Sequence, residues 1–368
     1  MRYLINGWLG HDNLGDDLLL LATVEGLVRR DPMASCYVLT ENVNSTMSLF
    51  SKELRKHVKA YRRRTGRLGW RWQMWQLARG ADYYLVAGGT ALRDFSFAPD
   101  TVTTQYKMAR LACFAGCKLQ FMGLGVGPLW RDCSRLTIRN LFSFSGVTVR
   151  DEQSYKQLLS CGVKDVKLAA DLVFSLDRLA GEKRSPREVK RIGLALRNWD
   201  TAFNRESDCE LLKAGELITK LKTVFPNAAL IFYCFQSQGD GVSNDYEFIK
   251  KVLDSDGLEA EIVSCTAEHS GGVSQVVNEF RKLDLLVGMR LHALILGAMQ
   301  GVPLVAIEYD PKVRALMKSL GCEQFCFAWN AWLDNDAEGI FSDAIKVEYS
   351  VSRLREMSER NFEFLSGA

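Results

Sequence analysis

Short apolar segments alternate with helical segments along almost the whole chain of 368 residues, and this alternation limits the folds that the chain can adopt. Apolar runs of about four to eight residues indicate strands that are buried on both faces. Strands that alternate with helices form parallel sheets, because each parallel connection needs a crossover. The pattern therefore predicts an α/β fold with helices on both faces of its sheets.

The first series of expected elements extends from residue 2 to residue 174. Its first helix is expected over 16–30, and a helix rich in alanine and methionine separates its third and fourth strands. The segments that contain its strands are RYLING (2–7), SCYVLT (35–40), ADYYLVAGG (81–89), KLQFMGLGVGP (118–128), GVTVRDEQSYKQLLSCGV (146–163, strand then helix) and VKLAADLVF (166–174).

A second series follows the charged segment RLAGEKRSPREVKR (178–191), which has no apolar face and indicates a linker. Its expected elements are IGLALR (192–197), a helix over 208–225, AALIFYCF (228–235), a helix near 244–254, EAEIVS (259–264) and DLLVGMRLHALILGAMQGVPLVAIEYDPK (284–312). A chain of this length exceeds one ordinary core. We therefore predict two Rossmann-like parallel-sheet domains facing a cleft, with the boundaries 1–178 (N-terminal domain), 179–191 (linker), 192–345 (C-terminal domain) and 346–368 (a C-terminal helix packing back on the N-terminal domain).

The composition is that of a globular protein, with 47% hydrophobic residues, 25% charged residues and a net charge of +3. The first residues, MRYLINGWLG, lack the apolar region of a signal peptide. No uncharged apolar run reaches the roughly 18 to 20 residues that span a bilayer. The ten cysteines include no CxxC pair, so we expect free thiols in a reducing cytoplasm and no metal site. The expected location is the cytoplasm.

Basic residues follow three expected strands of the second series. They are Arg197, Arg290, His292 and Lys312. Ligands of open parallel sheets bind beyond the carboxyl ends of the strands. Arginine pairs with carboxylates and phosphates, and helix N-termini add N–H donors. We predict a site for a small anion with several oxygens, in which His292 exchanges protons; the alternative for His292 is a histidine that only caps its helix.

Glycine-rich loops follow three expected strands of the first series: NGWLGHDNLGDD (6–17), AGGTALRD (87–94) and GLGVGP (123–128). The first loop is neither GxGxxG nor a P-loop, and its three aspartates repel a phosphate. Asparagine and aspartate side chains are good partners for sugar hydroxyls. The alternative for Asn13 or Asp16 is the N-cap of the following helix.

The segment KELRKHVKAYRRRTGRLGWRWQMWQ (52–76) concentrates Lys and Arg against the single Glu53 and contains three tryptophans. Such a combination can bind an anionic membrane surface or nucleic acid. No recognisable nucleic-acid-binding motif accompanies it, so no nucleic acid is expected. A solvated helix and an anionic membrane surface both remain open.

The motifs together resemble the polysaccharide pyruvyl transferase family, especially its bacterial cell-wall (S-layer anchoring) branch. The resemblance covers most of the chain and keeps the order GWLGHDNLGDDLLL, AGGTALRD, GLGVGP, VTVRDEQS, AADLVF and GMRLHALILGAMQGVPLVAIEYDPKV, of which the last is the most specific. It implies a glycosyltransferase-B-type architecture. It also implies transfer of pyruvate from phosphoenolpyruvate onto two hydroxyls of one sugar, which gives a cyclic ketal and phosphate without a cofactor.

The resemblance also implies roles for individual residues. Arg197 and Arg290 would hold the carboxylate and phosphate of the donor, Lys312 would assist, and His292 would be the general acid/base. The N-terminal domain would be the acceptor side and the C-terminal domain the donor side. The acceptor-binding residues would be Asn13, Asp16, Gly88, Gly89 and Thr90.

The cell-wall branch acts on a lipid-linked sugar intermediate, which implies a glycan acceptor at the inner face of the plasma membrane and a membrane for segment 52–76 to approach. Two positions depart from the family pattern. Thr90 stands where a third glycine is usual, and Asp17 stands where glutamate is common. Both lie on the acceptor side, so the resemblance specifies the donor more firmly than the acceptor.

Two other functions remain as alternatives. A nucleotide-sugar-dependent glycosyltransferase of the same architecture would need contacts to a base and a ribose, for which Glu308 is the best candidate. The other alternative is a non-catalytic binding protein that has kept the cleft. A module with no anion to bind would gain nothing from clustering Arg197, Arg290 and His292.

Overall fold

The computed structural model describes residues 1–66, 68–94, 101–181, 188–198, 209–237, 244–266, 272–328 and 337–366. The chain forms two compact units, each with its own sheet. Unit 1 comprises Met1–Gly10, Asp16–Leu176 and Ser352–Ala368, and unit 2 comprises His11–Gly15 and Asp177–Val351.

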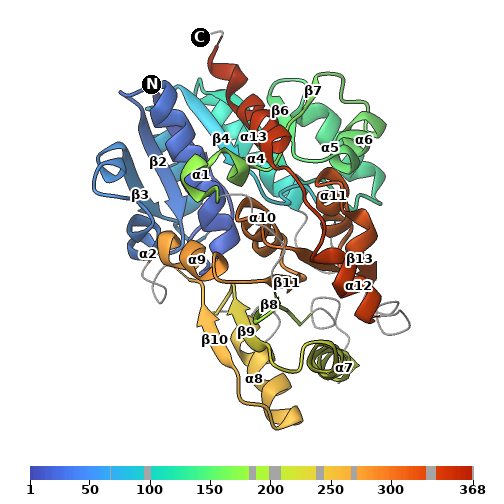
Figure 1. Ribbon diagram of the computed structural model, residues 1–368. Coiled ribbons are helices and arrows are strands. Elements are labelled where there is room, and N and C mark those ends of the chain that lie inside the picture. Colours follow the sequence, from blue (N-terminus) through green and yellow to red (C-terminus); the bar gives the residue numbers. More distant parts are fainter. Residues whose placement is uncertain are drawn as a thin grey trace. The chain divides into compact units, whose positions relative to one another are not determined.

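Unit 1 contains a seven-stranded parallel sheet in the order β3-β2-β1-β4-β5-β6-β7 (Figure 1). The strands are β1 (Arg2–Asn6), β2 (Ser35–Thr40), β3 (Val58–Arg62), β4 (Tyr83–Ala87), β5 (Lys118–Leu124), β6 (Gly146–Val149) and β7 (Val166–Leu168). The order reverses between β1 and β4. This topological switch point is where ligands of doubly wound sheets bind.

An apolar cluster from strands and helices forms the core of unit 1. The helices of the unit cover its sheet. They are α1 (Leu14–Arg30, from Asp16 onward in unit 1), α2 (Val43–Ser48), α3 (Gly69–Ala78), α4 (Thr101–Phe114), α5 (Asp132–Leu141), α6 (Glu152–Ser160) and α13 (Ser352–Glu359). The described residues of the unit also form the short 3-10 helices η1 (Leu54–His57), η2 (Leu172–Ser175) and η6 (Arg360–Leu365).

The C-terminal segment docks on unit 1. Glu359 pairs with Arg29 at 2.7 Å and also with Arg30, both on α1. Phe362 is buried against Gly26 of α1, where a Cβ would lie 2.1 Å from the phenyl ring. The contact therefore depends on the missing side chain at Gly26.

Unit 2 contains a six-stranded parallel sheet in the order β10-β9-β8-β11-β12-β13, with its switch point between β8 and β11 (Figure 1). The strands are β8 (Arg191–Ala195), β9 (Ala229–Cys234), β10 (Glu261–Ser264), β11 (Leu285–Gly288), β12 (Leu304–Glu308) and β13 (Cys326–Ala328). The helices are α7 (Cys209–Val224), α8 (Asp245–Asp256), α9 (Val273–Phe280), α10 (Leu291–Met299), α11 (Pro311–Ser319) and α12 (Ala337–Ala344). The described residues of unit 2 also form the 3-10 helices η3 (Asp177–Leu179) and η5 (Glu323–Phe325).

The predicted class of two Rossmann-like parallel-sheet domains is confirmed by these two sheets. Part of the predicted linker, residues 182–187, lies outside the described residues, as does residue 208 of the predicted helix 208–225. The predicted domain boundaries stay a prediction. No helix among the described residues is long and apolar enough to cross a lipid bilayer.

The basic segment 52–76 does not form the single solvated helix that was one interpretation of its sequence. It forms a 3-10 turn, the edge strand β3 and most of α3. Val58 of β3 is buried and pairs with Cys36 of β2. Val58 is β-branched and Tyr61 is aromatic, and both residue types favour a half-buried strand. The many Lys and Arg residues around them make this strand preference hard to recognise in the sequence.

Candidate functional site

The register of the unit 2 sheet brings Arg197 and Arg290 to the same level at the switch point. Ala195 of β8 pairs with Gly288 of β11, and each arginine lies two residues beyond its paired residue. The backbone N–H of Met289 donates to the carbonyl of Ala195 at 2.9 Å, which holds the two strand ends together. After burial, the charge of Arg290 is the next contribution that lowers the pKa of Arg197, so the two guanidinium groups lie near each other. Both arginines therefore lie at the carboxyl edge of the sheet, where the sequence predicted them.

Arg290 is a buried cation with a buried partner, Asp245 at the N-terminus of α8. The Nε of Arg290 donates to Asp245 at 3.0 Å, and its Nη2 donates to the second carboxylate oxygen. Asp245 also accepts the backbone N–H groups of Phe235 (3.1 Å) and Gln236 (3.2 Å). Burial lowers the pKa of Arg290, but the attraction of Asp245 outweighs it, so the pKa is raised.

Arg197, Tyr309 and Lys312 form a second group in unit 2. The guanidinium of Arg197 lies 5.3 Å from the centre of the Tyr309 ring, and the ammonium of Lys312 lies 5.0 Å from it. Burial and, to a smaller extent, the charge of Arg290 lower the pKa of Arg197.

Tyr309 carries an ionisable hydroxyl within this cationic group. Burial raises the pKa of its phenol, but Lys312, Arg197 and Arg290 together outweigh that effect and lower the pKa to about 8. The side chain of Lys312 also lies 3.8 Å from Asp310, which caps α11. The group therefore combines positive charge with a hydroxyl that ionises near neutral pH.

His292 is partly buried in the first turn of α10 and lies against the loop His11–Gly15, which belongs to unit 2. A Cβ at Gly15 would lie 2.2 Å from Nδ1 of His292, so the glycine makes room for the imidazole ring. Two contacts hold the loop in place: the Ser237 hydroxyl donates to Asp12 at 2.5 Å, and the Leu14 N–H donates to a backbone carbonyl of the segment after β9 at 3.0 Å.

Asn13 and Asp16 begin α1 with different roles. The Asn13 side chain accepts the N–H of Gly15 at 3.0 Å, which is the capping role that the sequence left open. Asp16 belongs to unit 1 and points toward Gly89, since a Cβ at Gly89 would lie 3.7 Å from the Asp16 carboxylate. Gly88 and Gly89 both have positive φ angles, which L-residues with side chains rarely adopt.

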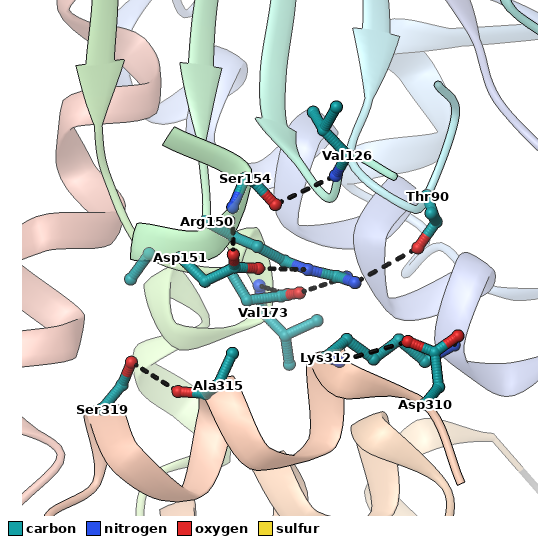
Figure 2. Close-up of polar contacts among 12 residues, drawn as sticks. Thr90, Val126, Arg150, Asp151, Ser154, Val173, Asp310, Lys312, Ala315 and Ser319 are labelled. Carbon is teal, nitrogen blue, oxygen red and sulfur yellow. Dashed lines mark hydrogen bonds and ion pairs between the residues drawn. The ribbon is translucent and has the colours of Figure 1, made fainter. Parts of the chain in front are cut away.

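Thr90 contacts Arg150, a buried residue of unit 1 that directly follows β6 (Figure 2). The Arg150 guanidinium donates to the Thr90 hydroxyl at 3.3 Å and to Asp171 at 3.2 Å, and lies 3.6 Å from Asp151. A Cβ at Gly125 would lie 2.6 Å from the same guanidinium. The loop GLGVGP thus provides the space that Arg150 occupies.

Three residues at these positions were missed by sequence reasoning: Asp245, Tyr309 and Arg150. Arg150 and Tyr309 directly follow strand ends, so the rule that found Arg197 could also have found them. Asp245 begins a helix, and no local signal connects it with an arginine 45 residues away.

Among the residues that the structure describes, no group of three or more His, Cys, Asp or Glu side chains could hold a metal ion. The side chains can bind anions through cations, exchange protons through His292 and Tyr309, and contact neutral hydroxyls through the loops of unit 1. The predicted binding and catalytic roles stay predictions.

Comparisons with known proteins identify both a family and a fold. The sequence profile of the family described as polysaccharide pyruvyl transferase matches residues 13–311. No curated protein gives a significant match. The UDP-GlcNAc 2-epimerase of Methanocaldococcus jannaschii is similar in structure, with a TM-score of 0.61, 11% identity and coverage of 100% of both chains. The UDP-GlcNAc 2-epimerase of Neisseria meningitidis bound to UDP-GlcNAc is also similar, with a TM-score of 0.60, 10% identity and coverage of 100% of both chains. At such identities the likeness concerns the fold alone.

Proposed function

Because the chain belongs to the polysaccharide pyruvyl transferase family and is therefore a transferase, we propose that it moves pyruvate from phosphoenolpyruvate onto two hydroxyls of one sugar. The sugar belongs to a cell-wall polysaccharide precursor, and the products are a cyclic ketal and inorganic phosphate. No cofactor takes part. Unit 2 binds the donor, and unit 1 binds the acceptor.

The observation that carries the proposal is the group of Arg197, Tyr309 and Lys312 beside Arg290 at the switch point of unit 2. Phosphoenolpyruvate bears a carboxylate and a phosphate on a three-carbon frame. Several cations at one sheet edge suit such a small, highly charged anion better than they suit a neutral sugar. The N-terminus of α10 adds backbone N–H donors.

The proposed reaction begins with a proton that His292 delivers to the methylene carbon of phosphoenolpyruvate. One sugar hydroxyl attacks the adjacent carbon and loses its proton. The bond between this carbon and the phosphate oxygen then breaks, and the second hydroxyl closes the ring. Of the two hydroxyl protons, one returns to His292 and the other leaves with the phosphate. Cations around the donor stabilise the phosphate as its bond breaks, and such preorganised charge is usually the largest catalytic contribution.

Tyr309 supports this chemistry by holding the donor-site cations. Its ring lies within cation–π distance of Arg197 and Lys312, and both cations lower the pKa of its hydroxyl. Unit 1 supplies the residues that contact the acceptor. Asp16 and the backbone at Gly89 offer hydrogen bonds to a neutral sugar, while the Thr90 hydroxyl is shared with Arg150.

A thermal-shift experiment tests the donor assignment. Phosphoenolpyruvate at about a hundredfold its dissociation constant should stabilise the protein by roughly 2.7 kcal/mol, and UDP-GlcNAc should not. Arg197→Met and Lys312→Met should abolish the shift. Lys318→Met, an exposed lysine on the same helix as Lys312, is the matched control and should keep it.

Stabilisation by a nucleotide sugar and not by phosphoenolpyruvate would overturn the proposal and favour a nucleotide-sugar-dependent transferase. Arg150→Met in the same assay reports whether the buried cation of unit 1 takes part in donor binding. Acceptor use is then measured as phosphate release with candidate polysaccharide precursors.

A further inference from the structure

One face of α3 is exposed although it carries large apolar side chains. Leu68, Arg71, Trp72, Trp75 and Arg79 follow the spacing i, i+3, i+4, i+7 and i+11, which places them on one side of the helix. Leu68 is 81% exposed, Trp72 49% and Trp75 37%. An ordinary surface helix presents polar side chains to water, so these exposed apolar side chains indicate an interaction surface.

The opposite face of α3 anchors the helix in unit 1. Met74 and Ala78 are buried in the core of the unit. The Gln73 side chain donates to the carbonyl of Arg62 at 2.7 Å and accepts the N–H of Arg64 at 2.9 Å. These bonds connect α3 with the end of β3, so the exposed face is held in a defined position.

Arginines accompany the tryptophans on this surface. Arg64 lies 5.0 Å from the ring centre of Trp72, and Arg79 lies 4.7 Å from that of Trp75. Arg71 contacts Trp70 at 5.6 Å. The arginines therefore lie beside the apolar face, with their charges available to an anionic partner.

The surrounding segment adds further positive charge. Residues 52–79 contain ten Lys and Arg residues and a single acidic residue, Glu53. Lys59 and Arg62 are exposed on β3, the edge strand of unit 1. Cations on an edge strand also discourage pairing with other strands, but that function does not require exposed tryptophans on the neighbouring helix.

We propose that α3 and the end of β3 form a docking surface for the headgroup region of an anionic lipid bilayer. Tryptophan favours the membrane–water interface, where its ring and its N–H are both satisfied, and Lys and Arg are attracted to anionic headgroups. Leu68 distinguishes this occupant from nucleic acid, because an exposed aliphatic side chain gains nothing from phosphates or bases but inserts between acyl chains. Docking of this kind is peripheral and needs no spanning helix.

The first test measures co-sedimentation of the full chain with vesicles of phosphatidylcholine, with and without about 30% phosphatidylglycerol. The wild-type protein should bind the anionic vesicles at physiological ionic strength, and binding should fall as salt is added. Trp72→Ala/Trp75→Ala should weaken binding by at least about tenfold. Trp130→Ala, which removes an exposed tryptophan outside this surface, is the control and should bind like the wild type.

The second test reverses charge. Arg62→Glu/Arg71→Glu should reduce the partition coefficient by about a hundredfold. Arg110→Glu/Arg353→Glu changes the net charge equally at exposed positions on α4 and α13, and it should have a much smaller effect. Circular dichroism and thermal melting verify that each variant is folded.

Quenching of tryptophan fluorescence by lipids brominated along the acyl chain adds a measurement that does not depend on affinity. Quenching in the wild type that is lost in Trp72→Ala/Trp75→Ala supports insertion. The proposal is overturned if the α3 variants and their controls bind anionic vesicles equally. It is also overturned if the wild type prefers single-stranded nucleic acid to vesicles at the same salt concentration. None of these readouts uses catalytic activity. They therefore test membrane docking separately from the assignment of phosphoenolpyruvate as the donor.

Discussion

Replacing Asp245 with asparagine leaves the Arg290 guanidinium buried opposite a neutral amide. The native carboxylate accepts two hydrogen bonds from Arg290 and one each from the N–H groups of Phe235 and Gln236. Asparagine can still accept the backbone bonds and the Nε bond on one oxygen, but its NH₂ group would face the Nη2 donor of Arg290. The change therefore removes the charge partner while it keeps the size of the side chain.

The expected loss of stability follows from the burial of the pair. Both side chains are almost inaccessible to solvent, at 1% for Asp245 and 9% for Arg290. Removal of one partner from a buried ion pair costs about 3–5 kcal/mol, because the other charge stays desolvated. For a domain of 150–250 residues, about 1 kcal/mol changes the melting temperature by roughly 2–4 °C. Asp245→Asn should therefore lower the melting temperature of unit 2 by roughly 6–20 °C.

Differential scanning calorimetry measures this loss, and urea unfolding gives the free energy independently. Glu152→Gln is the control, because it breaks the exposed pair between Glu152 and Lys156, and it should change stability by less than about 1 kcal/mol. Asp245→Asn/Arg290→Met removes both charges, keeps an acceptor for the two backbone N–H groups and should be more stable than Asp245→Asn. A stability of Asp245→Asn within about 1 kcal/mol of the wild type would refute the reasoning.

Three further predictions concern the donor side. His292→Asn should abolish turnover and retain the thermal shift with phosphoenolpyruvate; normal turnover would exclude the acid/base role. Gly15→Ala should lower activity because its Cβ would meet the imidazole of His292 at 2.2 Å. Its control is Gly80→Ala, where the nearest atom is 3.7 Å away; equal effects would contradict this account. Tyr309 should titrate near its pKa of about 8, below the ordinary 10.0. Because the native state releases this proton first, the free energy of unfolding should rise by roughly 3 kcal/mol between pH 8 and 10, with no contribution below pH 8. Phenolate absorbance in the wild type and in Tyr309→Phe measures this step, and its absence below pH 9 would contradict the prediction.

The sequence by itself determined the two α/β series and the sheet edge at which the predicted site residues lie. Buried parallel strands read as continuous apolar runs, and a ligand site of such a sheet follows its strand ends. These two local facts were sufficient to select Arg197, Arg290, His292 and Lys312. The residues that neighbour each of these side chains in space were not predicted.

Only the tertiary structure decided those neighbours, because they are set by strand register and by packing between distant segments. Asp245 meets Arg290 across two helix N-termini, and Gly15 meets the ring of His292. Tyr309 acquires its low pKa from cations that belong to separate strand ends. Local propensity carries no information about such pairings. The same reason explains β3, whose strand conformation depends on its partner β2 more than on its own highly charged sequence.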